Sequence, residues 1–193
     1  MATAKNNASA DARKKAEIKI TADFPAELKS YISDNAPQKN QDKHCHNIYL
    51  RTDETLTVYV DDKKITLKPR SQELLAYLLT AMGRIVPNTE LVRNVLKKEP
   101  DDASMMALRV NWFNLKQELK EYDIDYIVCS TRTGRGRCLD MAAVTSDLQQ
   151  MLSGDKARLS ALYINNYLFY YDWAAPMRHK LVRIAMTNLR QAA

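Results

Sequence analysis

The chain has 193 residues and a formal net charge of +6, with 29 lysines and arginines against 23 aspartates and glutamates. This length allows one domain with extensions or two small domains, and it suffices to bury a core without disulfides or metal ions. No apolar run reaches the roughly 18 residues that a membrane-spanning helix needs, and three cysteines without a secretory apolar segment are typical of reduced thiols in the cytosol. The composition therefore predicts a cytoplasmic protein with no membrane partner, and its positive charge makes a polyanion a candidate partner.

Residues 1–46 predict a flexible N-terminal arm and linker with one candidate helix. The first 17 residues are polar, small and lysine-rich, as in disordered segments. Pro25 suits the first turn of a short helix in PAELKSYISD. The tripeptide His44-Cys45-His46 contains metal-ligand types, but it lacks a fourth ligand at an informative spacing, so a polar linker is favoured over a metal site.

Residues 47–140 predict a domain that begins with a small antiparallel sheet. In TLTVYV, Leu56, Val58 and Val60 alternate with polar or aromatic residues, as in a half-buried strand. NIYLR has the composition of a preceding strand, and DDKK turns the chain into a third short run, ITL.

Three helices are expected after this sheet. KPRSQELLAYLLTAMG has Pro69 in its first turn and Gly83 where a C-terminal cap is expected. NTELVRNVLKK begins at Asn88, whose side chain is expected to cap the first turn. The third, SMMALRVNWFNLKQELKEY, follows a breaking and capping segment, EPDDAS, and it carries one apolar stripe made of Leu108, Trp112, Leu115 and Leu119.

A hairpin with a basic turn is expected in YDIDYIVCSTRTGRGRCLD. Between Cys129 and Asp140 the stretch has three arginines and no acidic side chain, so a solvent-exposed basic loop is expected. A two-residue turn at Thr133-Gly134 would place Cys129 directly opposite Cys138, with a redox pair and two reduced thiols as the alternatives.

Residues 141–193 predict a helical tail that dimerises or contacts another protein. Its helices are expected in AVTSDLQQMLSG, in a segment starting at Asp155 and in a segment starting near Pro176. With their leucine neighbours, the tail aromatics favour a packed core over a base-stacking platform; they are Tyr163, Tyr167, Phe169, Tyr170, Tyr171 and Trp173.

Several motifs resemble known families of transcription regulators. ITLKPRSQELLAYLLTAMGRIVPNTELVRNVL resembles the OmpR/PhoB-type winged-helix DNA-binding domain at Gly83, Arg84, Val86, Glu90 and Leu91. LRVNWFNLKQEL is similar to the third helix of that family, and TRTGRGRCLD is similar to its wing. The resemblance implies an α+β fold: a winged helix-turn-helix with an N-terminal antiparallel sheet and a C-terminal wing hairpin, followed by an α-helical tail.

The tail resembles the start of the bacterial transcriptional activation domain found in antibiotic-regulatory-protein activators. The shared features are Asp147, the Leu162-Tyr163 pair, and Asp172, Trp173, Ala174, Arg178 and Leu181. The chain departs from the winged-helix family where arginines are usual in the third helix, at Met106, Phe113 and Asn114, and where an aromatic commonly closes the wing, at Arg137.

These features predict a sequence-specific regulator of transcription that binds duplex DNA through a recognition helix in the major groove and an arginine-rich wing on phosphates or the minor groove. Its expected partners are double-stranded DNA, RNA polymerase and a second copy of the chain, at least on DNA. No catalytic constellation and no cofactor or metal motif emerges, so an enzyme is not expected. The alternative is a protein-interaction adaptor that kept the winged helix and lost DNA binding, which Met106 and Phe113 would suit. The expected DNA contacts are Arg109, Val110, Asn111, Asn114, Lys116, Thr131, Arg132, Thr133, Arg135 and Arg137.

Overall fold

The computed structural model describes residues 46–155, 159 and 161–191, which fall within one compact unit. The expected arm, its candidate helix at Pro25 and the dipeptide His44-Cys45 lie outside these residues. Within the described part of the chain, no three histidine, cysteine, aspartate or glutamate side chains gather as metal ligands. None of the described helices combines the length and apolar character that crossing a membrane requires.

The first sheet follows the predicted alternation. Strands β1 (Ile48–Thr52) and β2 (Leu56–Val60) both bury every second residue, and they pair antiparallel with Leu50 opposite Val58. Strand β3 (Lys63–Ile65) continues the antiparallel order, and its first residues come from the segment that the sequence assigns to the turn. A two-residue strand, β7 (Thr145–Ser146), pairs parallel with β1 and completes the order β3-β2-β1-β7.

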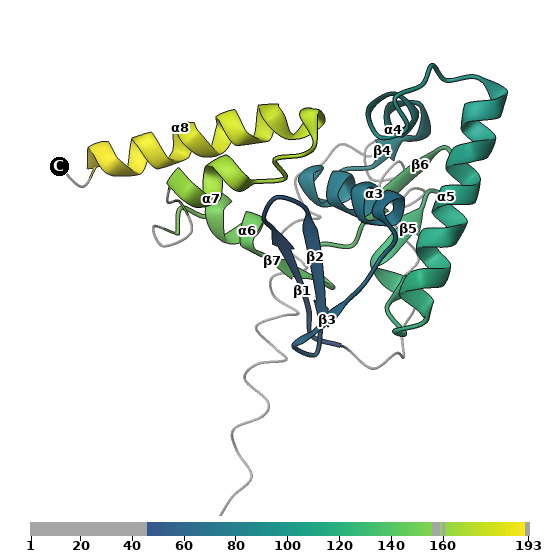
Figure 1. The fold of residues 1–193 in the computed structure, drawn as a ribbon, viewed down its shortest axis with the longest axis horizontal. Helices are drawn as coiled ribbons and strands as arrows, with labels where there is room; N and C mark the ends of the chain where they lie inside the picture. The colour runs from purple at the N-terminus through teal and green to yellow at the C-terminus, as the bar shows by residue number, and fades with distance from the viewer. Residues whose placement is uncertain (1–45, 156–158, 160, 192–193) are drawn as a thin grey trace, which may run out of the picture. The chain divides into compact units, whose positions relative to one another are not determined.

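The three predicted helices are α3 (Pro69–Thr80), α4 (Asn88–Asn94) and α5 (Asp102–Lys120). Their apolar faces form one core with the inner face of the sheet. Figure 1 shows how the three helices and the strands are arranged. The apolar stripe of α5 is buried as predicted, at Leu108, Trp112, Leu115 and Leu119. Glu118 interrupts this buried side, where its carboxylate accepts hydrogen bonds from Lys68 N at 2.8 Å and from Ser71 Oγ at 2.9 Å at the start of α3. The carboxylate therefore joins α5 to the first turn of α3.

The wing is the hairpin of β5 (Val128–Ser130) and β6 (Gly136–Leu139), which follows a short 3-10 turn, η1 (Asp125–Ile127). A two-residue strand before α4, β4 (Val86–Pro87), pairs with β6, so the second sheet has the order β4-β6-β5. Figure 1 shows α5 running beside β5 and β6. This arrangement is the winged helix that the sequence predicts.

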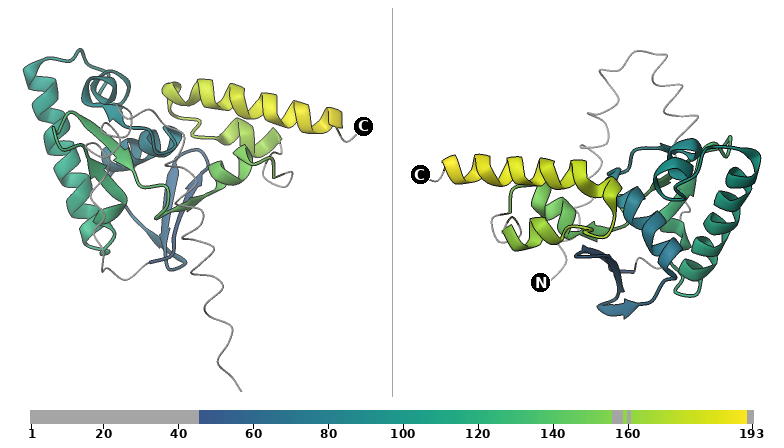
Figure 2. Two further views of the ribbon diagram at one scale, coloured as in Figure 1. Left: turned by 180° about the vertical axis from the view of Figure 1, so that it is seen from behind. Right: turned by 45° about the horizontal axis from the view of Figure 1, so that its top comes forward.

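The tail contains α6 (Asp147–Leu152), α7 (Ala161–Asn166), the 3-10 turn η2 (Asp172–Ala174) and α8 (Ala175–Gln191). Pro176 is the second residue of α8, as expected, whereas the described α7 begins after the predicted start at Asp155. The two views in Figure 2 show α8 lying along α6 and α7. Part of the aromatic cluster is core, as predicted, because Tyr167 is fully buried, but Phe169 and Tyr170 are exposed.

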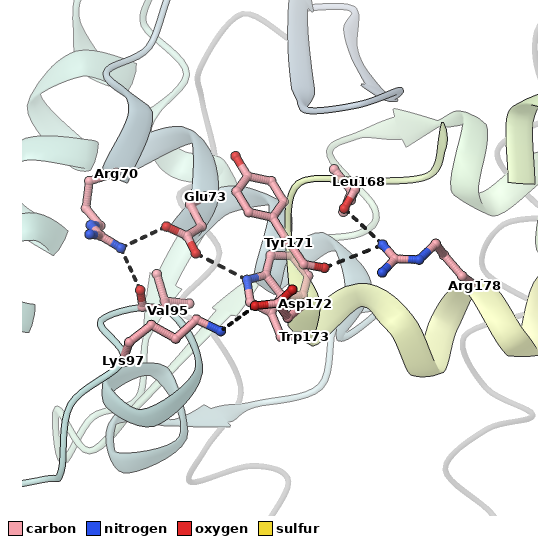
Figure 3. A network of polar contacts seen from close by, with 9 residues as sticks. All are labelled: Arg70, Glu73, Val95, Lys97, Leu168, Tyr171, Asp172, Trp173 and Arg178. Atoms are coloured by element: carbon pink, nitrogen blue, oxygen red, sulfur yellow. Dashed lines mark hydrogen bonds and ion pairs between the residues drawn. The ribbon is translucent and has the colours of Figure 1, made fainter. Parts of the chain in front are cut away.

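Polar contacts and aromatic rings join the tail to the winged helix. The Tyr167 hydroxyl lies 2.7 Å from Thr80 Oγ1, and the Trp173 ring meets the Tyr77 ring edge to face at 4.8 Å. Figure 3 shows how Glu73 of α3 accepts a hydrogen bond from the Trp173 indole at 3.3 Å. In the same view, Lys97 of the winged helix pairs with Asp172 of the tail. Within the tail, the Arg178 guanidinium donates to the backbone carbonyls of Leu168 and Tyr171. The first part of the tail therefore packs directly against the sheet and α3.

Candidate nucleic-acid interface

A reciprocal capping box stabilises the N-terminus of α5. Asp101 accepts a hydrogen bond from Ser104 N at 2.7 Å, and Ser104 Oγ accepts one from Asp101 N at 2.9 Å. Such a box satisfies two amide groups that have no partner within the helix. The hydrogen bonds from Ser104 lower the pKa of the Asp101 carboxyl below its usual value. The cap stabilises the start of α5, and the buried stripe determines which side of the helix faces solvent.

The predicted contact residues of α5 divide between its outer face and its two flanks. Arg109 and Val110 are exposed, whereas Asn111, Asn114 and Lys116 are half-buried. At about 3.6 residues per turn, Arg109 and Lys116 fall on one flank, Asn111 and Asn114 fall on the other, and Val110 lies between them. The helix therefore offers guanidinium and ammonium groups on one side and amides on the other.

The wing turn is longer than the two residues that the sequence suggests. Thr131 N donates to Gly136 O at 3.0 Å, and Gly134 N donates to Thr131 O at 2.8 Å, so Arg132 to Arg135 form the loop. Gly134 has a φ of +68°, a conformation that glycine adopts without steric cost. Arg132, Thr133 and Arg135 are exposed, while the Thr131 hydroxyl accepts from Gly136 N at 3.1 Å. The longer loop extends the exposed basic segment without changing the register of the strands.

Asn88 holds this loop in place. Its backbone N–H donates to Arg135 O at 2.9 Å, and its side-chain amide donates to Gly134 O at 2.8 Å. The expectation that Asn88 caps α4 is therefore wrong, because Asn88 is already the first residue of α4 and makes no side-chain capping bond. The pairing of β4 with β6 brings the amide to the wing instead.

Arg137 supports the wing from inside. The side chain is only 6% exposed, and its guanidinium lies 4.9 Å above the Trp112 ring of α5. It donates to the carbonyls of Gly134 and Gly136, both at 3.2 Å. Burial lowers the pKa of Arg137, and the nearby positive charge of Arg109 adds to the effect. The structure thus separates Arg137 from the exposed wing residues, because its side chain packs over Trp112 of α5.

Gly136 allows the hairpin to approach the chain before α4. A Cβ atom at this position would lie 2.6 Å from Ile85 Cγ2, which is shorter than real side-chain contacts. The neighbouring pair, Cys129 and Cys138, is directly opposed across the hairpin, so the predicted register is confirmed. Both cysteines are free thiols, and the Cys129 thiol lowers the pKa of Cys138.

Four cations of this region have no acidic partner within the described part of the chain. Arg109, Lys116, Arg132 and Arg135 make no ion pair with any carboxylate among residues 46–155, 159 and 161–191, whereas Arg84 forms a bidentate pair with Glu90 at 2.6 and 3.0 Å. Arg109 and Lys116 lie on the same side of α5 as Trp112, whose ring packs at 4.9 Å beneath the Arg137 guanidinium of β6. The basic flank of α5 therefore faces the wing, and positive charge on the two elements is left for an anionic ligand.

Sequence reasoning missed three supporting residues of this site. The sequence indicates a capping role for Asn88 and a place in the core stripe for Trp112, and it assigns no role to Glu118. A signal for Glu118 exists, because a carboxylate between Leu115 and Leu119 on the buried side of α5 requires hydrogen-bond partners. No local sequence pattern predicts the contacts of Asn88 with the wing.

Comparisons with known proteins agree with this architecture. Residues 62–137 match the family model described as "Transcriptional regulatory protein, C terminal", the OmpR/PhoB-type DNA-binding domain. This family comprises DNA-binding regulatory domains rather than enzymes. No curated protein matches the chain.

A solved structure shows the same fold. EmbR of Mycobacterium tuberculosis, determined in complex with a low-affinity phosphopeptide, aligns with a TM-score of 0.55 at 15% sequence identity. The similarity covers 74% of this chain and 43% of the EmbR chain, so this chain spans less than half of the length of EmbR. The winged helix with a helical tail that the sequence predicts is thus confirmed as the fold.

Proposed function

We propose that this chain, whose residues 62–137 carry an OmpR/PhoB-type DNA-binding domain, is a sequence-specific regulator of transcription that docks α5 in the major groove of duplex DNA. The wing then lies along the adjacent backbone or enters the minor groove. We place this action in the cytoplasm, where a bacterial regulator meets DNA.

One observation carries the proposal: the exposed wing and the flank of α5 that faces it hold four cations without acidic partners in the described structure. Uncompensated positive charge on adjacent elements matches the phosphate backbone, which supplies much of the affinity of DNA-binding proteins. The wing is also held in position by Asn88 and Arg137, which limits the entropy lost when DNA orders it.

The proposed roles follow from side-chain chemistry and exposure. Arg109 can donate two hydrogen bonds to guanine, and the amides of Asn111 and Asn114 can pair with adenine. Lys116 and Thr133 bind phosphate oxygens, and Val110 contacts base edges. Arg132 and Arg135 bind phosphates or a narrow minor groove, where negative potential attracts arginine. Thr131 acts through its backbone and through its bond to Gly136, and Arg137 positions the wing from below.

The tail is proposed to mediate assembly. Phe169 and Tyr170 form an exposed edge-to-face pair at 5.7 Å on a segment that Leu168 N anchors to Asp53 O at 2.6 Å. Exposed aromatic side chains held by a rigid backbone are common at protein interfaces. A second copy of the chain, at least on DNA, and RNA polymerase are the proposed partners of the tail.

A second candidate function is a protein-binding adaptor. The observation in its favour is that Met106, Val110 and Phe113 are exposed together on one face of α5, and contiguous exposed apolar side chains often mark an interaction site. The two candidates differ in their dependence on salt. Phosphate binding weakens steeply with added salt, whereas apolar docking does not.

The test is duplex binding by fluorescence anisotropy over a range of salt concentrations, with a genomic fragment pool and with duplexes selected from it. If Lys116, Arg132 and Arg135 each neutralise one phosphate while Arg109 contacts a base, log affinity should fall against log salt with a slope of about −2.7. The double variant Arg132→Ala/Arg135→Ala should weaken binding on every duplex and reduce the slope by about 2.

The matched control removes the same amount of charge from the tail. Lys180 and Arg183 are exposed on α8, which packs against α6, α7 and η2. Lys180→Ala/Arg183→Ala should leave the slope unchanged. Absence of duplex binding at low salt, or equal effects of the two double variants, would contradict the proposed interface.

A further inference from the structure

Three large apolar side chains lie on the outermost face of α5, where the same helical row continues to the polar Gln117. Met106, Val110 and Phe113 are 55%, 53% and 61% exposed, and their spacing aligns them on one side of the helix. We call these three residues the apolar ridge. The ridge does not contribute to the core, because the buried stripe that includes Leu108 and Trp112 occupies the opposite side of α5.

The surroundings of the ridge restrict what can cover it. On one flank, Arg109 and Lys116 lie on either side of Trp112, whose ring is 4.9 Å from the Arg137 guanidinium of the wing hairpin. On the other flank, at about 3.6 residues per turn, lie the amides of Asn111 and Asn114. An occupant of this face must therefore offer apolar groups at its centre, anionic groups toward the wing, and hydrogen-bond donors and acceptors toward the amides.

The major groove at A·T base pairs provides all three. The C5-methyl group of thymine projects into this groove, and adenine beside it presents an N7 acceptor and an N6 donor that an asparagine amide can bind. A G·C pair has no methyl group there. Phosphates border the groove on both sides, where the basic flank and the wing can reach them.

We propose, on the basis of the DNA-binding function above, that the apolar ridge reads thymine methyl groups and that the recognised half-site is A·T-rich beneath the centre of α5. From Met106 to Phe113 the ridge extends about 10 Å along the helix. Base pairs follow one another about every 3.4 Å. The ridge therefore covers about three base pairs, and Val110 lies over the middle one.

The test uses deoxyuridine, which pairs like thymidine but lacks the C5-methyl group. In a duplex selected by the wild-type chain, each thymidine is replaced singly, and affinity is measured by anisotropy. Replacement within the central half-site should weaken binding about threefold to fivefold per methyl group, as expected for one methyl group withdrawn from burial. Replacement outside the footprint should have no effect.

Variants assign the effect to the ridge. Phe113→Ala and Val110→Ala should weaken binding to the thymidine duplex and should reduce or abolish the further loss caused by deoxyuridine. Alanine is the best helix former, so α5 is retained, which circular dichroism checks. Met186→Ala, which removes a 56% exposed side chain from α8, is the matched control and should keep the full sensitivity to deoxyuridine.

Three outcomes overturn the inference. If every deoxyuridine duplex binds as tightly as its parent, or if the ridge variants keep full sensitivity, the ridge does not read methyl groups, while the salt-dependent binding and the proposed function stand. If no duplex binds the wild-type chain at low salt, the proposed function fails together with the inference, and the ridge is left to a protein partner.

Discussion

Replacement of Arg137 by methionine distinguishes a supporting role of this side chain in the wing from a contact with DNA. Among the three wing arginines, the structure buries this one over Trp112 and leaves Arg132 and Arg135 exposed. We predict that Arg137→Met folds with a free energy of unfolding within about 1 kcal/mol of wild type, because a buried charge without an acidic partner can often be exchanged for an apolar side chain of similar volume.

The contacts of Arg137 explain why the change in the free energy of unfolding should be small. Its guanidinium gains about 0.5–2 kcal/mol from the Trp112 ring. Its two hydrogen bonds are replaceable, because Gly134 O also accepts from Asn88 and Gly136 O also accepts from Thr131 N. Two costs offset these gains. The charge is desolvated, and the buried Nε atom has no hydrogen-bond partner in the described structure.

Arg137→Ala provides the contrast. It removes the aliphatic stem that packs beside Trp112, and truncation of a buried side chain of this size costs about 2–5 kcal/mol. We therefore expect Arg137→Ala to be about 2 kcal/mol less stable than Arg137→Met. Urea unfolding followed by far-ultraviolet circular dichroism measures both values.

DNA binding completes this test. The salt slope of Arg137→Met should equal that of wild type, whereas Arg135→Ala should lower it by about 0.9. If Arg137→Met lowered the slope by the same amount as Arg135→Ala, Arg137 would contact phosphate and our assignment of a supporting role would be refuted. Equal stability of the methionine and alanine variants would refute the packing argument.

Three further predictions concern the supports of the domain and of the tail. Asn88→Ala should change the free energy of unfolding by no more than about 1 kcal/mol, since one hydrogen bond is lost and a buried Oδ1 atom without a partner in the described structure is removed with it. The variant should nevertheless loosen the wing and weaken duplex binding. Unchanged anisotropy titrations would contradict this. The Arg84 guanidinium lowers the pKa of Glu90. The pair therefore stabilises the fold above the ordinary carboxyl pKa, and this contribution is lost as pH falls through the lowered value. Glu90→Gln should reduce the loss of folding stability at acidic pH, and an unchanged dependence of stability on pH would argue against this reading. Tyr167→Phe should cost about 1 kcal/mol through the lost bond to Thr80, measured by urea unfolding, and a neutral result would show that the buried hydroxyl adds nothing to the attachment of the tail.

Local periodicity was sufficient to predict the framework of the winged helix. The four apolar residues of α5 recur at helical spacing, and the alternation in β2 marks a half-buried strand, so both patterns report burial directly. The opposition of Cys129 and Cys138 also followed from the sequence, although the loop is longer than expected, because both loop lengths give the same register.

The supports of the site could not be predicted in this way. Asn88 reaches the wing because β4 pairs with β6, and no local pattern specifies that pairing. Arg137 shares its charge and its neighbourhood with Arg135, and only the position of Trp112 on a distant helix decides which arginine is buried. In the tail, a run of aromatics indicates a core, but the sequence does not tell that Tyr167 enters it while Tyr170 faces solvent.

The central claim is that α5 and the wing together form the DNA interface. It is tested most directly by backbone amide chemical shifts of the full chain during titration with a selected duplex. We predict that the largest changes map to residues 106–117 of α5 and to the loop 131–135, with small changes in α8. Changes confined to the tail, or none at saturating duplex concentrations, would contradict the account.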